Sequence, residues 1–221
     1  MGKTKVGVLL SGCGVKDGSE IHEATLTLYF LDRAGAEIIC MAPDRAQLDV
    51  VDHTSGSPSE EKRNVMIESA RIARGDIRDI KTIKADDLDA IIIPGGFGAA
   101  KNLCSFAVDG AACTVDEGVA ALLVELHRNK KPVGALCIAP AVVVAALGKI
   151  CSPKITIGND EATAAAMEAM GARHEVASVD EIVVDVENRI VTTPCYMLAK
   201  SIGEFGAGVE KLVAKIIELA G

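Results

Sequence analysis

The chain has 221 residues, of which 49% are hydrophobic, so it can bury one large core and we expect a single domain spanning residues 1–221. The formal net charge is −8 at pH 7 and no basic stripe occurs, which argues against nucleic acid as a partner. No apolar stretch is long enough to span a bilayer, so we expect a cytoplasmic protein without a membrane partner.

Short apolar runs alternate with helical patterns along the chain, which is typical of a parallel sheet covered by helices. The sequence therefore predicts an α/β fold with a mostly parallel sheet and helices on both faces. In chain order we expect a strand at 5–10, a helix at 20–34, a strand at 37–41, a helix at 64–74, strands at 90–93 and 132–136, a helix at 139–147, a strand at 154–157, a helix at 161–170, an antiparallel hairpin of strands 182–185 and 190–193, and a helix at 209–219.

Cys137 lies where an apolar strand pattern breaks and a helical pattern begins, within KPVGALCIAPAVVVAAL. Pro140 fits the first turn of that helix. A sharp strand-to-helix corner of this kind presents a nucleophile at the edge of a sheet. Because the positive end of a helix dipole favours thiolate, we expect the pKa of Cys137 to lie below the free value of about 8.5.

The remaining cysteines form no CxxC pair and no zinc spacing. We therefore expect no metal site, and we expect reduced thiols in the core or in loops, because free cysteine behaves mainly as a small buried hydrophobe. These cysteines are Cys13, Cys40, Cys104, Cys113, Cys151 and Cys195.

Two glycine-rich loops follow predicted strands, at residues 11–18 and 94–98. Ligand sites in open α/β sheets lie beyond the carboxyl ends of the strands, so both loops belong to the candidate site. The first loop spells GxGxxxG instead of the dinucleotide fingerprint GxGxxG, and it lacks the GK[ST] ending of a P-loop. We therefore expect tight turns and no cofactor.

Four separated motifs, SGCGVKDGSEIHEA, PGGFGAAKNL, GALCIAP and VTTPCYM, make the chain resemble the bacterial ElbB proteins, which are named for enhancing lycopene biosynthesis. That group lies within the PfpI-like superfamily of class I glutamine amidotransferase-like folds. The resemblance covers nearly the whole chain. It implies a flavodoxin-like three-layer sandwich, a homodimer and, from the name of the group alone, a link to isoprenoid biosynthesis.

The resemblance also implies roles for particular residues. It places the nucleophile at Cys137 and its acidic partner at Glu23, in the first helix. It implies that the backbone amides of Gly96 and Ile138 form an oxyanion hole, with Gly95 beside them. Glycine lets the backbone approach a ligand closely, and an amide at the start of a helix points at developing negative charge.

Two glutamates fall in the predicted first helix. Leu26 and Phe30 follow Glu23 at i+3 and i+7, so we expect Glu23 on the inward stripe. For Glu20 we expect a solvated position in the first turn, where an acidic side chain favours the helix dipole. A carboxyl group buried beside a thiolate tends to keep its proton, which is what a general acid/base requires.

The superfamily's hydrolases carry a histidine after the strand that follows the nucleophile, but this chain has KITIGND there. Hydrolysis by a Cys/His pair is therefore disfavoured, and we expect Asp160 in that segment to cap a helix. His22 or His53 could orient the catalytic residues without contacting substrate, or each could be a surface or capping residue. Lys101 could attract an anionic substrate or could be a solvated lysine.

This set of residues suits a small reactive carbonyl compound as substrate. The sequence predicts a glyoxalase that needs no metal, glutathione or nicotinamide, in which Cys137 adds to an aldehyde and Glu23 moves a proton between carbons. One alternative is a regulatory protein, linked to isoprenoid biosynthesis, whose Cys137 is oxidised without turnover. Another is a glutaminase subunit whose missing histidine comes from a partner.

Overall fold

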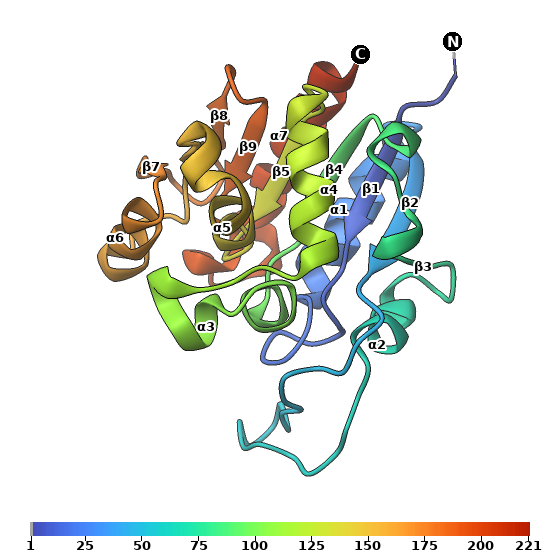
Figure 1. Ribbon diagram of the computed structural model, residues 1–221, viewed down its shortest axis with the longest axis vertical. Coiled ribbons are helices and arrows are strands. Elements are labelled where there is room, and N and C mark those ends of the chain that lie inside the picture. Colours follow the sequence, from blue (N-terminus) through green and yellow to red (C-terminus); the bar gives the residue numbers. More distant parts are fainter. Residues whose placement is uncertain (1) are drawn as a thin grey trace.

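A seven-stranded sheet forms the centre of the computed structural model, which describes residues 2–221 (Figure 1). The strand order is β3-β2-β1-β4-β5-β9-β8, and every neighbouring pair is parallel except β8 and β9. The prediction of a mostly parallel α/β fold is thus confirmed. The strands are β1 (Lys5–Leu9), β2 (Glu37–Ala42), β3 (Arg78–Asp79), β4 (Ala90–Ile93), β5 (Val133–Leu136), β8 (Val183–Asp185) and β9 (Ile190–Thr193).

Helices cover both faces of the sheet, with α4 and α5 in front and α1 and α7 behind in Figure 1. The alternation of a strand explains the two layers of core. In β4, Ile91 and Ile93 face α4 and α5, whereas Ala90 and Ile92 face α1 and α7. The longer helices are α1 (Ile21–Arg33), α2 (Val65–Ile72), α4 (Glu117–Arg128), α5 (Pro140–Cys151), α6 (Glu161–Ala169) and α7 (Ile202–Ala220).

The strand expected at 154–157 does not join the main sheet. Only Lys154–Ile155 forms a strand, β6, which pairs with β7 (Arg173–His174) in a separate two-stranded sheet. The Thr156 amide donates to the Thr192 hydroxyl of β9 at 2.8 Å, and the Lys154 amide donates to Asp185 Oδ2 at 2.7 Å. Side chains of the main sheet therefore accept the hydrogen bonds that a further strand would need for a backbone ladder.

The last helix begins at Ile202, seven residues before the predicted start at 209. Its first turns contain Gly203, Gly206 and Gly208, which lower helix propensity and concealed the helix in the sequence. Phe205 in the same turns is fully buried. Packing of that ring against the sheet therefore outweighs the low propensity of the glycines.

The carboxyl ends of β1, β4 and β5 lie at one edge of the sheet, on the two sides of the point where the strand order reverses. The segment 43–64 projects beyond this edge (Figure 1). From residue 2 onward, no helix has the length and apolar character of a bilayer-spanning segment.

Candidate active site

Cys137 lies directly after β5, at a sharp corner before α5. Its φ is +57°, a left-handed conformation that costs a non-glycine residue on the order of 1–3 kcal/mol and is typical of functional corners. The Cys137 amide donates to the Thr193 carbonyl of β9 at 2.9 Å, which ties the corner to the neighbouring strand. The Cys137 residue is only 8% exposed.

Glu23 lies in the first turn of α1 and is completely buried. The buried stripe of α1 comprises Glu23, Thr27 and Leu31, at spacings of i+4 and i+8, with Ala24 beside Glu23. Leu26 and Phe30, from which the inward position of Glu23 was predicted, are only half-buried. The predicted burial of Glu23 is therefore confirmed, although the helix faces the core along a slightly rotated stripe.

Two backbone amides hold the Glu23 carboxyl group. The Gly95 amide donates to Oε2 at 2.9 Å and the Tyr196 amide donates to Oε1 at 3.3 Å. The same carboxyl group lies beside the Cys137 side chain, and each of the two groups shifts the pKa of the other. Segments from α1, from the turn after β4, from the corner after β5 and from the turn after β9 therefore converge on one Cys–Glu pair.

Gly95 has no side chain, and this leaves room for Cys137 and Glu23 to lie side by side. A Cβ atom at position 95 would lie 2.5 Å from Cys137 Cβ and 2.7 Å from Glu23 Oε2. The resemblance had suggested that Gly95 lies at the oxyanion hole. Its amide donates to Glu23 instead, so it does not face an oxyanion position. Gly95 instead positions the acid/base candidate.

The backbone amides of Gly96 and Ile138 both act on the Cys137 thiol and lower its pKa. Gly96 has a φ of +94°, and Ile138 follows the corner immediately. These are the two amides that the resemblance assigned to an oxyanion hole. An oxygen that develops charge on a carbon bonded to the sulfur would lie within their reach.

Burial controls the protonation of the pair. Burial and, to a smaller extent, the Glu20 carboxylate raise the pKa of Glu23 to about 8, against the lowering effect of the Tyr196 and Gly95 amides and the Cys137 thiol. Burial and then the Glu23 carboxylate raise the pKa of Cys137 well above its ordinary value. The predicted lowering of the thiol pKa is therefore wrong, because burial outweighs the two amides. At neutral pH both groups keep their protons.

Glu20 is only 7% exposed, so the predicted solvated position is wrong. Its Oε2 caps α1 by accepting the Glu23 amide at 2.7 Å. Glutamate is an unusual residue at the N-cap position, which is why the sequence did not reveal this role. Glu20 also lies against the cavity described below, where its charge acts on Glu23.

A cavity of about 430 Å³ opens above the Cys137 sulfur. Its walls are mainly apolar and include Phe97, Phe106 and Met197. Its polar walls include Glu20 and Asp160, and no lysine or arginine belongs to the lining among the described residues. The cavity therefore favours neutral, partly apolar ligands over anions.

The loop after β9 supplies residues to which the sequence analysis gave no role. Cys195 is fully buried and has a φ of +45°, which turns the following Tyr196 amide toward Glu23. Tyr196 and Met197 line the cavity. A signal was available, because the motif VTTPCYM runs from the predicted strand 190–193 into the following loop, at the carboxyl edge of the sheet.

His22 lies at the rim of the site. Its Nδ1 is 2.9 Å from the Tyr196 hydroxyl and 3.6 Å from Glu20 Oε1. About half of its side chain is exposed. His22 thus contacts two residues of the cavity wall, Tyr196 and Glu20.

His53 and Lys101 lie farther from the Cys–Glu pair and brace the glycine loop after β1. The Lys16 amide donates to His53 Nε2 at 3.1 Å, and Lys101 Nζ donates to the Lys16 carbonyl at 3.0 Å. Lys101 also pairs with Asp49 Oδ2 at 2.8 Å. Lys101 is therefore neither solvated nor part of the cavity lining.

Asp160 caps α6 by accepting the Thr163 amide at 2.8 Å, as predicted. Both residues also line the cavity. Between residues 2 and 221, no histidine belongs to the cavity lining. That same part of the chain contains no group of three or more His, Cys, Asp or Glu residues that could hold a metal ion.

Comparison with known proteins agrees with this geometry. The model of the DJ-1/PfpI family matches residues 13–195, which include Glu23, the turn after β4 and Cys137. The chain belongs to the DJ-1/PfpI family. It is 46% identical, over 98% of its length and 84% of the relative's, to the human glutamine amidotransferase-like class 1 domain-containing protein 3, mitochondrial.

The rat ES1 protein homolog, mitochondrial, is 45% identical over 99% of this chain and 85% of that protein. Both of these DJ-1/PfpI relatives are named mitochondrial proteins, which contradicts the cytoplasmic location predicted from the sequence. The apolar content of a folded chain carries no information about its compartment. The prediction rested on the lack of a membrane span and on reduced cysteines, which many compartments share.

Solved structures show the same DJ-1/PfpI fold. A crystal structure from Ehrlichia chaffeensis, described as an isoprenoid biosynthesis protein with an amidotransferase-like domain, has a TM-score of 0.90 and 37% identity, covering 97% of this chain and 99% of that one. Drosophila melanogaster DJ-1beta has a TM-score of 0.55 and 16% identity, covering 99% and 96%. The flavodoxin-like three-layer arrangement predicted from the resemblance is confirmed.

Proposed function

We propose that this chain is a cofactor-independent glyoxalase that converts small 2-oxoaldehydes to 2-hydroxy acids. The observation that carries the proposal is the buried Cys137–Glu23 pair, with two amides that act on the thiol and a mainly apolar cavity above it. A nucleophile, a neutral carboxyl group and an oxyanion site are the three parts that such an isomerisation requires.

The reaction begins when the pair releases one proton and the Cys137 sulfur bonds to the aldehyde carbon. The carbonyl oxygen takes the proton of Glu23 and becomes the hydroxyl of a hemithioacetal. The Glu23 carboxylate then removes the hydrogen of that carbon as a proton and returns it to the neighbouring carbon. The hydroxyl proton of the hemithioacetal moves to the neighbouring carbonyl oxygen, which leaves a 2-hydroxy thioester. Water breaks the carbon–sulfur bond, so that methylglyoxal plus water gives lactate and a proton.

The Gly96 and Ile138 amides stabilise the oxygen while it carries charge. The raised pKa of Glu23 lets this group act as an acid and as a base near neutral pH. Tyr196 and Gly95 keep its two oxygens fixed between these roles, because their amides bind the carboxyl group in either protonation state.

The finer assignment within the family is also part of the proposal. The four motifs and the 37% identity to the Ehrlichia protein support membership in the ElbB-like group and a role beside isoprenoid biosynthesis. The two mammalian relatives support a mitochondrial location for this group. A homodimer remains a prediction from the resemblance.

The oxidation alternative receives less support from the site. Oxidants react with thiolate, and burial raises the pKa of Cys137 well above its ordinary value. The glutaminase alternative also lacks support, because no described histidine lines the cavity. Turnover of a neutral carbonyl compound fits the protonated pair better than either alternative.

We expect the purified protein to convert methylglyoxal and glyoxal to 2-hydroxy acids without added metal or glutathione. Cys137→Ala should remove the activity, since no carbon–sulfur bond can form. Glu23→Gln should lower kcat by about 10²–10⁴-fold, the usual contribution of general acid/base catalysis. The measurement is the rate of lactate formation, with Cys151→Ala as a control that changes a half-buried cysteine outside the site. Equal rates in all four proteins would exclude the proposed mechanism.

The charge of the cavity predicts selectivity for neutral substrates. Hydroxypyruvaldehyde phosphate should have a lower kcat/KM than hydroxypyruvaldehyde, because Glu20 and Asp160 repel its phosphate. Asp160→Asn should raise kcat/KM for the phosphorylated compound about fivefold, corresponding to roughly 1 kcal/mol of repulsion removed. Asparagine caps a helix as well as aspartate does, so stability should be unchanged. A preference for the phosphorylated substrate in the wild-type protein would contradict this account of the cavity.

A further inference from the structure

Two cysteines outside the catalytic pair close a loop beside the cavity. Cys104 and Cys113 flank α3 (Phe106–Asp109) and the turn at Gly110–Ala112. The base of the loop is held by an antiparallel bridge between Cys104 and Val115 and by further backbone hydrogen bonds. Because Cys104 pairs with Val115 and the Ser105 amide donates to the Thr114 carbonyl at 2.9 Å, Cys104 and Cys113 lie diagonally across this base, within reach of each other. They therefore lie close enough to react with one another after a small side-chain movement.

The two thiols differ in exposure and in acidity. Cys113 is half-buried, whereas Cys104 is only 4% exposed. The neighbouring Cys104 thiol lowers the pKa of Cys113, against the raising effects of burial and of Asp109, and Cys113 raises the pKa of Cys104. A lowered pKa favours the thiolate of Cys113, the form that oxidants attack. The pKa of the catalytic Cys137 is shifted upward instead.

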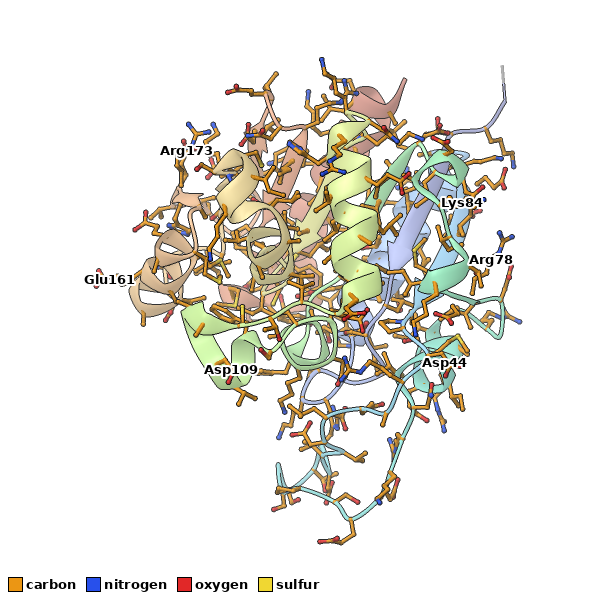
Figure 2. All side chains as sticks on the ribbon, viewed as in Figure 1. Asp44, Arg78, Lys84, Asp109, Glu161 and Arg173 are labelled. Atoms are coloured by element: carbon orange, nitrogen blue, oxygen red, sulfur yellow. The ribbon has the colours of Figure 1, made fainter. Side chains whose placement is uncertain are left out.

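Each of the two sulfurs lies against an uncharged neighbour. Cys113 Sγ lies 3.5 Å from the Met170 sulfur, a soft and apolar neighbour. On the other side, Cys104 Sγ lies 3.5 Å from the Ala99 carbonyl. Asp109 is the charged side chain that acts on Cys113, and Figure 2 shows it at the outer end of α3.

We propose that Cys104 and Cys113 are a redox-active dithiol that becomes a disulfide when a hydroperoxide reaches Cys113. The Cys113 sulfur attacks one peroxide oxygen, the O–O bond breaks, and the other oxygen leaves as an alcohol or water after taking a proton. This step gives a sulfenic acid. The Cys104 sulfur then attacks the Cys113 sulfur, the S–O bond breaks, and hydroxide leaves as water with the Cys104 proton. Two thiols and one hydroperoxide thus give one disulfide, one alcohol or water, and one further water.

A disulfide between Cys104 and Cys113 would affect the cavity, because the loop between them forms part of the cavity wall. Phe106 and Ala107 lie within the loop and line the cavity above Cys137. A disulfide would join the two ends of their segment covalently and restrict the movement of that wall. The inference does not depend on the glyoxalase proposal, since it concerns two thiols that take no part in that mechanism.

The experiment treats the purified full-length protein with an equimolar amount of hydrogen peroxide, unfolds it in iodoacetamide and digests it with trypsin. Residues 102–128 contain no lysine or arginine before Arg128, so Cys104 and Cys113 fall in one fragment and are its only cysteines. We expect most of this fragment to lack two hydrogen atoms and both alkyl groups. Prior treatment with dithiothreitol should restore both alkylation sites.

Matched variants separate this pairing from general oxidation. Cys113→Ser and Cys104→Ser should each abolish the mass change, whereas Cys151→Ser, at another half-buried cysteine, should leave it unchanged. Recovery of the wild-type fragment with both thiols alkylated would overturn the proposal. So would a stable oxygen adduct on Cys113 while Cys104 remains a free thiol.

Discussion

Glu23→Gln should remove a large pH dependence from the stability of the protein. The ordinary pKa of this carboxyl group is 4.5, and in the folded protein it is about 8. Between these values the folded state holds one more proton than the unfolded state, so stability falls as pH rises. The Glu23 contribution to that fall is about 1.4 kcal/mol per pH unit. Urea unfolding at several pH values would measure it.

Comparison of the variant with the wild-type protein isolates this effect from other titrating groups. Between about pH 5 and about pH 8, Glu23→Gln should gain stability relative to wild type with each pH unit. Glu161→Gln is the matched control, because Glu161 is also in the first turn of a helix but points into solvent (Figure 2). That control should follow the wild-type curve. Parallel curves for Glu23→Gln and wild type would show that Glu23 is ionised in the folded protein.

Gly95→Ala should damage both stability and catalysis. The new methyl group would meet Cys137 Cβ at 2.5 Å, Glu23 Oε2 at 2.7 Å and the Leu136 carbonyl at 2.9 Å. Overpacking of a buried site costs about 1–3 kcal/mol, and this position lies at the upper end because backbone atoms cannot move aside easily. Displacement of the pair by about 1 Å should lower the rate of lactate formation about 100-fold.

Gly203→Ala provides the control for that substitution. Gly203 lies in α7 with no atom within 4 Å of an added Cβ, and its backbone is helical. The change should leave activity unchanged and raise the free energy of unfolding by up to about 1 kcal/mol. If Gly95→Ala behaved like Gly203→Ala in urea unfolding and in the assay, the close contact around Gly95 would be disproved.

The corner at Cys137 could be predicted because its cause is local. An apolar run that breaks and restarts with Pro140 determines a strand, a turn and a helix from neighbouring residues alone. The protonation of Cys137 could not be predicted, because burial by Glu23, by the turn at Gly95 and by the loop before Tyr196 comes from distant parts of the chain. Helix dipoles are visible in a sequence, whereas desolvation is a property of the assembled site.

The same distinction explains the other differences. Glu20 looked solvated because its own helix offered no reason to bury it, yet it caps α1 and faces the cavity. The apolar pattern at 154–157 predicted a strand, but its hydrogen-bond partners on β8 and β9 are side chains. From the sequence Lys101 could be a solvated lysine, but in the structure Asp49 of segment 43–64 lies beside it. Each case depends on contacts that connect residues far apart in the chain.

Because the Cys137–Glu23 pair is uncharged at rest, the electrophiles that react with Cys137 should differ from those that react with a free thiolate. An alkyl halide has no atom that can accept a proton while the Cys137 sulfur attacks it. It therefore faces a protonated thiol, which is a poor nucleophile, and reacts slowly. A carbonyl compound provides such an atom next to the carbon under attack, and Glu23 is placed to protonate it. Selectivity between electrophiles would then follow from proton acceptance as well as from shape.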